Sequence, residues 1–393
     1  MLTTEQIATL KKSPVYNFSL SSKELFHSNF IYWLLNDIAN QNNNEECKLF
    51  WRLLCEKSLL PKELYDFEIQ ADIHRERNNT DLQFSILNSE GTRKRIIVEN
   101  KVKSIPYIEQ LEDYALISTD NDLLILLTLH DPKSLKNPIG QIELNNKKIW
   151  HVITYETFRD ILVSFIKTDI NASDTYRNKI VADYILLIST LIEIDKNAGI
   201  EKSEPFNWHS NEFYYQLKDL RIADFYIKKK CTLLVEEIEK ALKNDEDFAG
   251  LLTTKFNWEK SEPQIWVSAG FTNGSGIIDI KYKFIQNLSI GIQIQGNQFR
   301  LDVEEGGKEL GLNKSKKLAE KLNENSDWFD FTIVENSGIV YPKNNGLNKY
   351  GQIFWYRYVN IPEQTSLGKI MECILIYLKK YNNQIEYLKS ETI

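Results

Sequence analysis

The chain is poor in cysteine, and this scarcity limits the chemistry that it can perform. Four of the 393 residues are cysteines, and they are scattered along the sequence. Cys47 and Cys55 lie on one expected helix, about 12 Å apart along its axis, which is too far for a disulfide. No spacing of cysteine and histidine fits a zinc site. We therefore expect the cysteines to be small buried side chains in a reducing compartment.

Long apolar runs and an excess of basic residues are also missing. No run approaches the roughly 20 apolar residues that a membrane-spanning helix requires, and residues 1–13 lack the charged-then-apolar layout of a secretory signal. The sequence thus predicts a cytoplasmic protein without a membrane partner. Its formal net charge of −7 argues mildly against nucleic acid as a partner, because nucleic-acid-binding proteins usually carry an excess of lysine and arginine.

What the chain does contain is typical of a globular protein with two domains. Apolar residues make up 42% and charged residues 26% of the sequence, which are ordinary proportions. A length of 393 residues exceeds what one hydrophobic core usually supports. Residues 197–207 have the polar composition of a linker, with Gly and Pro. We therefore predict one domain over 1–200 and a second over 205–393.

The periodicity of apolar residues predicts an α/β fold for the first domain, with a mixed β-sheet and helices on both faces. The expected elements are helices at 21–35, 46–58, 106–118, 157–167 and 176–195, strands at 67–74, 121–130 and 149–155, and a hairpin over 81–103. The second domain is predicted to be α+β. Its expected helices lie within 209–244, 314–324 and 365–389, and its expected strands at 264–270, 276–284, 288–295, 298–303, near 328–335 and at 352–360.

The hairpin over residues 81–103 carries the most informative pattern in the chain. If its strands fold about Glu90, the numbers of opposing residues sum to 180. Leu82 then faces Val98, and one side of the ribbon is consistently apolar. The pattern therefore predicts the register of the two strands.

The polar side of the hairpin predicts a metal site. It places Asp81 directly opposite Glu99, with Lys101 on the same face as Glu99. Two carboxylates this close repel each other, and one stays protonated unless a cation lies between them. The crowding fits a hard divalent metal with oxygen ligands. The alternative is a solvated strand end with ordinary surface charges, since the Glu-x-Lys spacing also occurs at Glu46-Cys47-Lys48.

The charge around the hairpin differs from that of the whole chain. Between Asp72 and Lys103, seven Lys and Arg residues accompany five Asp and Glu residues. Two of these five acids are the expected metal ligands, so a bound metal would make the segment clearly positive. The negative net charge of the chain therefore does not exclude a polyanionic substrate.

The helix after the hairpin adds two polar side chains. Gln110 and Tyr114 are four residues apart and share one helical face, with Tyr107 one turn earlier on the same side. An amide and a phenol there could orient the lysine and hydrogen-bond a phosphate. Alternatively, Tyr114 belongs to the edge of the core and Gln110 to the surface.

Together these features resemble the PD-(D/E)XK nuclease superfamily, which has the restriction-endonuclease-like fold. The resemblance rests on Thr80-Asp81, Ile97-Val98-Glu99-Asn100-Lys101 and Gln110-Leu111-Glu112-Asp113-Tyr114. It covers about residues 20–165 and is strongest to the branch with an additional Gln-x-x-x-Tyr helix. The helix with Glu24, His27 and Ser28 resembles a bacterial family of this superfamily. Thr80 stands where the superfamily name expects proline.

The resemblance implies a metal-dependent deoxyribonuclease that acts on DNA in phage defence, restriction or repair. Asp81 and Glu99 would hold Mg²⁺, with Mn²⁺ as a substitute. Lys101 would orient or deprotonate the attacking water and help to neutralise the phosphate. Gln110 and Tyr114 would support catalysis from the neighbouring helix.

Glu24 and His27 have two interpretations each. A glutamate on the first helix often lies near the metal in this superfamily, which makes Glu24 a third candidate ligand. However, Ser21-Ser22-Lys23-Glu24 also forms a capping box, which requires the same glutamate for helix initiation alone. His27 is either a packing and hydrogen-bonding residue or a ligand.

Two rival functions are also compatible with the sequence. One is a DNA-binding protein that keeps the fold but does not cut, although the intact trio of Asp81, Glu99 and Lys101 speaks against it. The other is a partner-sensing protein whose second domain controls a silent nuclease. Tryptophans of the second domain could stack on bases or fill its core. The sequence leaves the DNA form, the sequence preference and the oligomeric state open, a homodimer included.

Overall fold

The computed structural model divides the chain into two compact units. They are Met1–Ala198 with Gln216–Tyr226, and Gly199–Tyr215 with Ile227–Ile393. The division after Ala198 is close to the expected boundary, but residues 216–226 join the first unit. The two domains as independent folding units stay a prediction. The structure describes residues 3–12, 15, 24–40, 44–77, 79–102, 108–132, 135–168, 175–253, 256–307, 313–325, 328–332, 334, 346–383 and 389.

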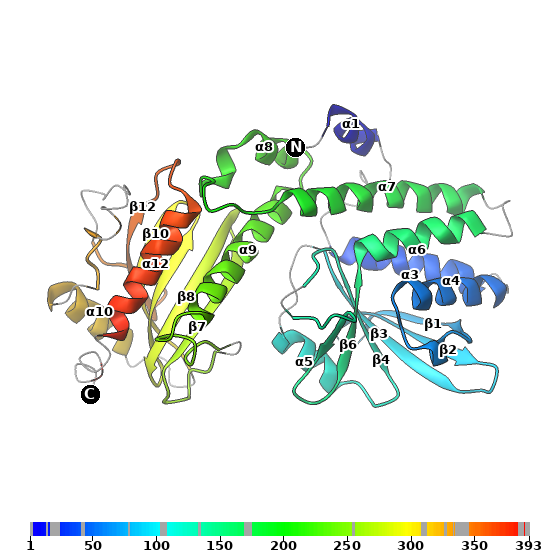
Figure 1. Ribbon diagram of the computed structural model, residues 1–393, viewed down its shortest axis with the longest axis horizontal. Coiled ribbons are helices and arrows are strands. Elements are labelled where there is room, and N and C mark those ends of the chain that lie inside the picture. The colour runs from blue at the N-terminus through cyan, green and yellow to red at the C-terminus, as the bar shows by residue number, and fades with distance from the viewer. Residues whose placement is uncertain are drawn as a thin grey trace. The chain divides into compact units, whose positions relative to one another are not determined.

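The first unit contains a mixed six-stranded sheet (Figure 1). In spatial order its strands are β1 (Phe67–Arg77), β2 (Thr80–Asn88), β3 (Arg93–Lys101), β4 (Leu123–Thr128), β6 (Ile149–Thr154) and β5 (Gln141–Glu143). β3, β4 and β6 are parallel, and the other neighbours are antiparallel. The predicted α/β fold with a mixed sheet is confirmed. The short strand β5 was not expected, because three residues are too few to show an alternating pattern.

Helices cover both faces of this sheet. They are α3 (Glu24–Asn40), α4 (Asn44–Lys57), the single turn η1 (Lys62–Leu64), α5 (Ile108–Leu116), α6 (Tyr155–Thr168) and α7 (Thr175–Asn197), with α1 (Thr4–Lys12) near the N-terminus. Leu111 of α5 packs with Ile97 and Leu124 in one apolar cluster. On the other face, Trp51 of α4 contacts Phe84 edge to face. Alternate residues of β3 therefore point into two different helical layers.

The hairpin has the predicted register. Leu82 pairs with Val98, and Phe84 pairs with Ile96. The tight turn contains Gly91 at φ +81°, a backbone angle that favours glycine. β1 continues three residues beyond its expected end because it pairs along most of β2.

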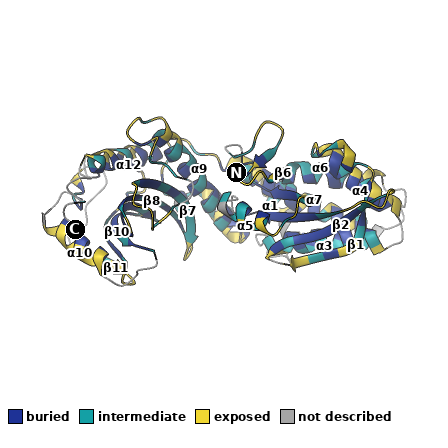
Figure 2. Ribbon diagram, turned by 90° about the horizontal axis from the view of Figure 1, so that it is seen from below, coloured by how far each residue is buried: buried dark blue, intermediate teal, exposed yellow. Residues whose placement is uncertain are grey.

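The second unit contains an antiparallel six-stranded sheet, as the α+β prediction requires. In spatial order its strands are β11 (Asn348–Tyr350), β12 (Phe354–Asn360), β10 (Gln298–Glu305), β9 (Leu288–Gln295), β8 (Ser275–Ile285) and β7 (Gln264–Thr272). Its helical elements are η2 (Trp208–Ser210), α10 (Lys314–Asn325), α12 (Leu367–Asn382) and most of α9 (Ala223–Lys243). α8 (Glu212–Asp219) is divided between the two units, and the first residues of α9 belong to the first unit. α9 and α12 lie against the sheet (Figure 1), and buried residues follow the strands of both sheets (Figure 2).

One expected strand of the second unit is wrong. The described residues between 328 and 334 contain no strand. Trp328 is 1% exposed, packs edge to face on Tyr381 and donates its ring N–H to the carbonyl of Asp302 at 3.0 Å. The apolar pattern that predicted a strand thus reflects burial against α12. The end of the predicted last helix, at 384–388, lies outside the described residues.

The four cysteines are free and buried, as expected. Burial raises the pKa of Cys47 to about 11 and that of Cys55 to about 12, which keeps both thiols protonated and inert. Among the helices that the structure describes, none is long and apolar enough to cross a membrane. The cytoplasmic location stays a prediction.

Candidate active site

β2, β3 and α5 bring the predicted site residues together at the end of β3. Asp81 is the second residue of β2, and Glu99 and Lys101 end β3. Because β2 and β3 are antiparallel, the start of β2 adjoins the end of β3. Glu99 and Lys101 lie two and four residues after Ile97 along β3, so they share with Ile97 the face of the sheet that α5 covers.

Asp81 is held by a side-chain hydrogen bond. The register pairs between β2 and β3 begin at Leu82 and Val98. Beyond them, Asp81 Oδ2 accepts the main-chain N–H of Asn100 at 2.7 Å. Continued by one residue, this register leaves Asp81 opposite Glu99 as expected, and the Asp81 side chain also bonds to the next residue of β3. Burial raises the pKa of Asp81, although the N–H of Asn100 acts in the opposite direction.

Glu99 is the most constrained acid of the site. It is 2% exposed, and its Oε1 lies 2.7 Å from Lys101 Nζ. Its Oε2 is buried without a hydrogen-bond partner among the described residues. Burial, with the charge of Asp81 added, raises the pKa of Glu99 to about 7. This carboxylate therefore lacks a positive partner for one of its oxygens.

Lys101 remains a cation in this setting. Burial alone would lower the pKa of Lys101, but Glu99 at 2.7 Å and the nearby acids Glu24 and Asp81 raise it above its usual value. A lysine that holds its proton this strongly is a poor base. It is suited to orienting a water molecule and to neutralising a phosphate oxygen.

Glu24 lies at the same end of β3. It begins α3, and its Oε1 accepts the main-chain N–H of Val102 at 3.3 Å. Its charge contributes to the raised pKa values of both Asp81 and Glu99. The serines of the predicted capping box lie outside the described residues. The carboxylate of Glu24 thus lies beside the end of β3, and its role as a metal ligand stays a prediction.

Gln110 and Tyr114 face the carboxylates from α5. Gln110 Nε2 donates to the hydroxyl of Tyr114 at 3.0 Å and approaches Glu99 Oε1 at 3.5 Å, a distance at which a hydrogen bond is weak. The ring of Tyr114 also packs on the apolar cluster below α5. The ring of Tyr114 thus lies at the edge of the core, its hydroxyl bonds to Gln110, and its part in the site stays a prediction. Tyr107 lies outside the described residues.

The donor set fits a hard divalent cation. The unpartnered Oε2 of Glu99 and the raised pKa values of Asp81 and Glu99 indicate excess negative charge that a cation would neutralise. Within the described ranges, however, no three His, Cys, Asp or Glu side chains are grouped to hold a metal. Mg²⁺ often binds through one or two carboxylates, with water and substrate phosphate as its other ligands, so two acids are sufficient.

Comparison with protein families agrees with this geometry. A model of the PD-(D/E)XK nuclease superfamily matches residues 15–185. These residues belong to that superfamily. No curated protein matches the chain. Membership makes the first unit a candidate phosphodiester hydrolase with a nucleic-acid substrate, in a superfamily that typically uses divalent metals.

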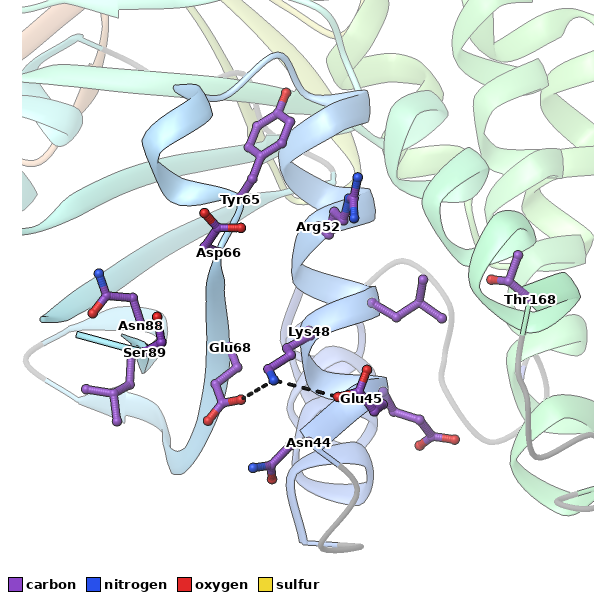
Figure 3. Close-up of a pocket in the computed structure, with 13 residues that line it drawn as sticks. Asn44, Glu45, Lys48, Arg52, Tyr65, Asp66, Glu68, Asn88, Ser89 and Thr168 are labelled. Carbon is purple, nitrogen blue, oxygen red and sulfur yellow. Dashed lines mark ion pairs between the residues drawn. The ribbon is translucent and has the colours of Figure 1, made fainter. Parts of the chain in front are cut away.

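The large pocket of this superfamily unit is separate from the site. It has a volume of about 950 Å³ and lies between α4, β1 and the turn after β2 (Figure 3). Its lining residue Asn88 ends β2, about 23 Å along the strand from Asp81. Lys48 in the pocket pairs with Glu68 at 3.9 Å. The pocket is therefore distinct from the predicted site residues at the other end of β2.

Other polar and aromatic side chains have structural explanations. Arg75, near the end of β1, lies over the ring of Tyr32 at 5.0 Å. In the second unit, Trp208, Trp328 and Trp355 are buried. These three tryptophans fill the core, which leaves base stacking without support from them.

The side chain of Asn100 was not among the predicted site residues. This middle residue of the Glu-x-Lys motif is 2% exposed and makes three side-chain hydrogen bonds. Strand alternation offered the signal, because a polar residue that alternates with Glu99 and Lys101 must enter the opposite helical layer. A polar residue in that layer needs polar partners.

Proposed function

We propose that this chain is a Mg²⁺-dependent deoxyribonuclease whose first unit hydrolyses phosphodiester bonds of DNA. The observation that supports this best is the buried Glu99, which pairs with Lys101 through one oxygen and leaves the other unpartnered among the described residues. Mn²⁺ would substitute, because it takes the same oxygen ligands.

Each residue has a defined task in the proposed reaction. Asp81 and Glu99 would hold the metal, which when bound supplies Lewis-acid charge and a more acidic water. Lys101 directs its ammonium group at the attacking water and at the charge that develops on the phosphate. Glu24 adds negative charge at the same edge. Gln110, which is hydrogen-bonded to Tyr114, helps to orient the carboxylate of Glu99 through its Oε1 atom.

The second unit is proposed to select the target or to bind a regulating partner. Its antiparallel sheet lies outside the residues that match the superfamily. Roles in phage defence, restriction or repair are supported by the superfamily alone. A silent DNA-binding or partner-sensing protein is the alternative, and it predicts DNA binding without cleavage.

A panel of labelled nucleic acids tests the proposal. Single-stranded and double-stranded DNA, linear and supercoiled DNA, and RNA are incubated with the full chain in Mg²⁺, Mn²⁺ or chelator. Metal-dependent cleavage of DNA that disappears in Lys101→Ala is the expected result. Binding without cleavage in every metal would favour the silent alternative, and cleavage in chelator would contradict the metal requirement.

A further inference from the structure

The side chain of Asn100 enters the helical layer on the face of β3 opposite to Glu99. Its Nδ2 donates to Ser28 Oγ at 3.0 Å and to the main-chain carbonyl of Glu24 at 3.3 Å, both on α3. Its Oδ1 accepts the hydroxyl proton of Tyr155 at 2.8 Å. The amide thus joins the end of β3 to the first turn of α3 and to the start of α6.

A buried hydrogen-bond chain continues from this amide. Tyr155 is hydrogen-bonded to Tyr184 of α7, and the Tyr184 hydroxyl lies 2.9 Å from His27 Nδ1. The exposed fractions of these three side chains are 0%, and Ser28 is 2% exposed. Water can therefore replace a hydrogen-bond partner in this network only if the surrounding structure opens locally.

One acceptor sets the direction of the bonds around the Asn100 amide. The carbonyl of Glu24 can only accept, so the Nδ2 of Asn100 must face it and Oδ1 must face Tyr155. Tyr155 then uses its single proton on Asn100, while the direction of the bond between Tyr184 and His27 depends on the tautomer of the imidazole. Ser28, which accepts from Asn100, donates its own proton to the Glu24 carbonyl at 3.2 Å. The bonds of the amide itself have one consistent arrangement of protons.

The same residue also fixes the acids through its main chain. The N–H of Asn100 holds Asp81 Oδ2 at 2.7 Å, and the turn of α3 that its amide grips begins with Glu24. Glu24 in turn accepts the N–H of Val102. Rotation of Asn100 would therefore move Asp81 and the first turn of α3 relative to Glu99.

We propose that Asn100 is a positioning residue that sets the distance between the metal-binding acids, and that the Tyr155–Tyr184–His27 chain holds it in place. This inference rests on the proposed function. The middle residue of the Glu-x-Lys motif is then a required part of the site. Ser28 contacts Asn100 directly and His27 contacts Tyr184, so both act through Asn100 and do not bind the metal.

Tyr155→Phe is the first test, with Tyr377→Phe as the matched control. Both changes delete one buried tyrosine hydroxyl, and Tyr377 donates to the carbonyl of Asp330 in the second unit. Mg²⁺ binding to the full chain is measured by calorimetry. We expect Tyr155→Phe to raise the Kd for Mg²⁺ about tenfold, while both variants lose similar thermal stability. Cleavage at saturating Mg²⁺ should return close to the wild-type rate.

Hydrogen exchange provides a readout that does not depend on metal or cleavage. In Tyr155→Phe, the amides of residues 97–102 should exchange about tenfold faster than in Tyr377→Phe. This comparison keeps its meaning if the wild-type protein cuts no DNA, so failure of the proposed function and failure of the inference are distinguishable. Unchanged exchange together with an unchanged Kd for Mg²⁺ would overturn the inference.

Asn100→Asp tests the direction of the bonds. The substitution keeps the shape of the side chain but places a carboxylate oxygen against the Glu24 carbonyl, where a donor is required. We expect a loss of Mg²⁺ affinity of about 100-fold, larger than that of Tyr155→Phe. An affinity equal to that of the wild type would contradict the inference, and Tyr155→Phe decides the question if this variant does not fold.

Discussion

Each unit of this protein contains a strand with an acid two residues before a lysine, and the two sites differ in what surrounds them. Glu99 and Lys101 stand at the end of β3, whereas Asp279 and Lys281 stand in the middle of β8. In the first unit, Lys101 pairs with Glu99, whose Oε2 is unpartnered among the described residues.

In the second site the lysine is surrounded by acids and aromatic rings. Lys281 Nζ lies 2.5 Å from Glu304 and 3.6 Å from Asp279. The same ammonium group lies over the rings of Trp258 and Trp266 at 5.4 and 5.8 Å. The lysine thus acts as the internal cation of an acidic cluster in the middle of a sheet. Acid-x-Lys spacing therefore does not by itself define a metal site, because in β8 the same spacing lies in the middle of a strand beside two tryptophan rings.

Removal of the two lysines should have the most different consequences. Lys101→Met should reduce cleavage by about 10³-fold or more because the charge at the phosphate is lost. Its fold should persist, since Glu99, whose pKa is already raised to about 7, can take up a proton. Lys281→Met should keep cleavage but destabilise the protein by about 3–5 kcal/mol, because its acids lose their cation. Cleavage assays and thermal melts of both variants measure this contrast. Equal cleavage by the two variants would show that the two lysines do not differ in their contribution to catalysis.

Mg²⁺ should stabilise one site and not the other. At about 100 times its Kd, a ligand of the folded state adds about 2.7 kcal/mol to the free energy of unfolding. We expect Glu99→Gln to abolish this increment, because it removes one of two ligands. Asp302→Asn, in the second cluster, should retain the increment. Denaturant unfolding with and without Mg²⁺ gives the values, and a Mg²⁺ effect that survives Glu99→Gln would exclude Glu99 as a ligand.

The stability of the metal-free protein should depend on pH through Glu99. Because its pKa is raised from 4.5 to about 7 in the folded state, this residue favours folding fully below pH 4.5, and that contribution is lost as the pH rises through 7. The loss amounts to up to about 3 kcal/mol. Glu99→Gln should remove this slope, seen as the difference between the unfolding free energies of the two proteins from pH 5 to 8. Identical slopes would show that Glu99 titrates normally.

The smallest effects are expected from α5. Gln110→Ala and Tyr114→Phe should each reduce cleavage about tenfold, because they loosen the Oε1 side of Glu99 without removing a ligand or a charge. Single-turnover rates at saturating Mg²⁺ measure this. Effects as large as that of Lys101→Met would instead give these residues a direct part in the reaction.

The site residues were predictable to the extent that strand periodicity places them. Alternation and turn position gave the pairing of Leu82 with Val98 and put Lys101 beside Glu99. The side-chain bond from Asp81 to the N–H of Asn100 was not predictable, because strand periodicity gives the face of a side chain but not its hydrogen-bond partner. The expected strand at 328–335 failed because an apolar pattern does not reveal whether a segment pairs with a sheet or packs on a helix.

The sequence by itself determined which residues lie on each face of a strand, since the two-residue period of the backbone is a local property. It therefore determined that Glu99 and Lys101 share one face. Only the tertiary structure decided which helix covers each face, and so which side chains meet there. Asn100 reaches Ser28 and Tyr155 because three helices distant in sequence converge behind β3. Such long-range packing depends on the shapes of all the contacting elements together, which no local pattern records.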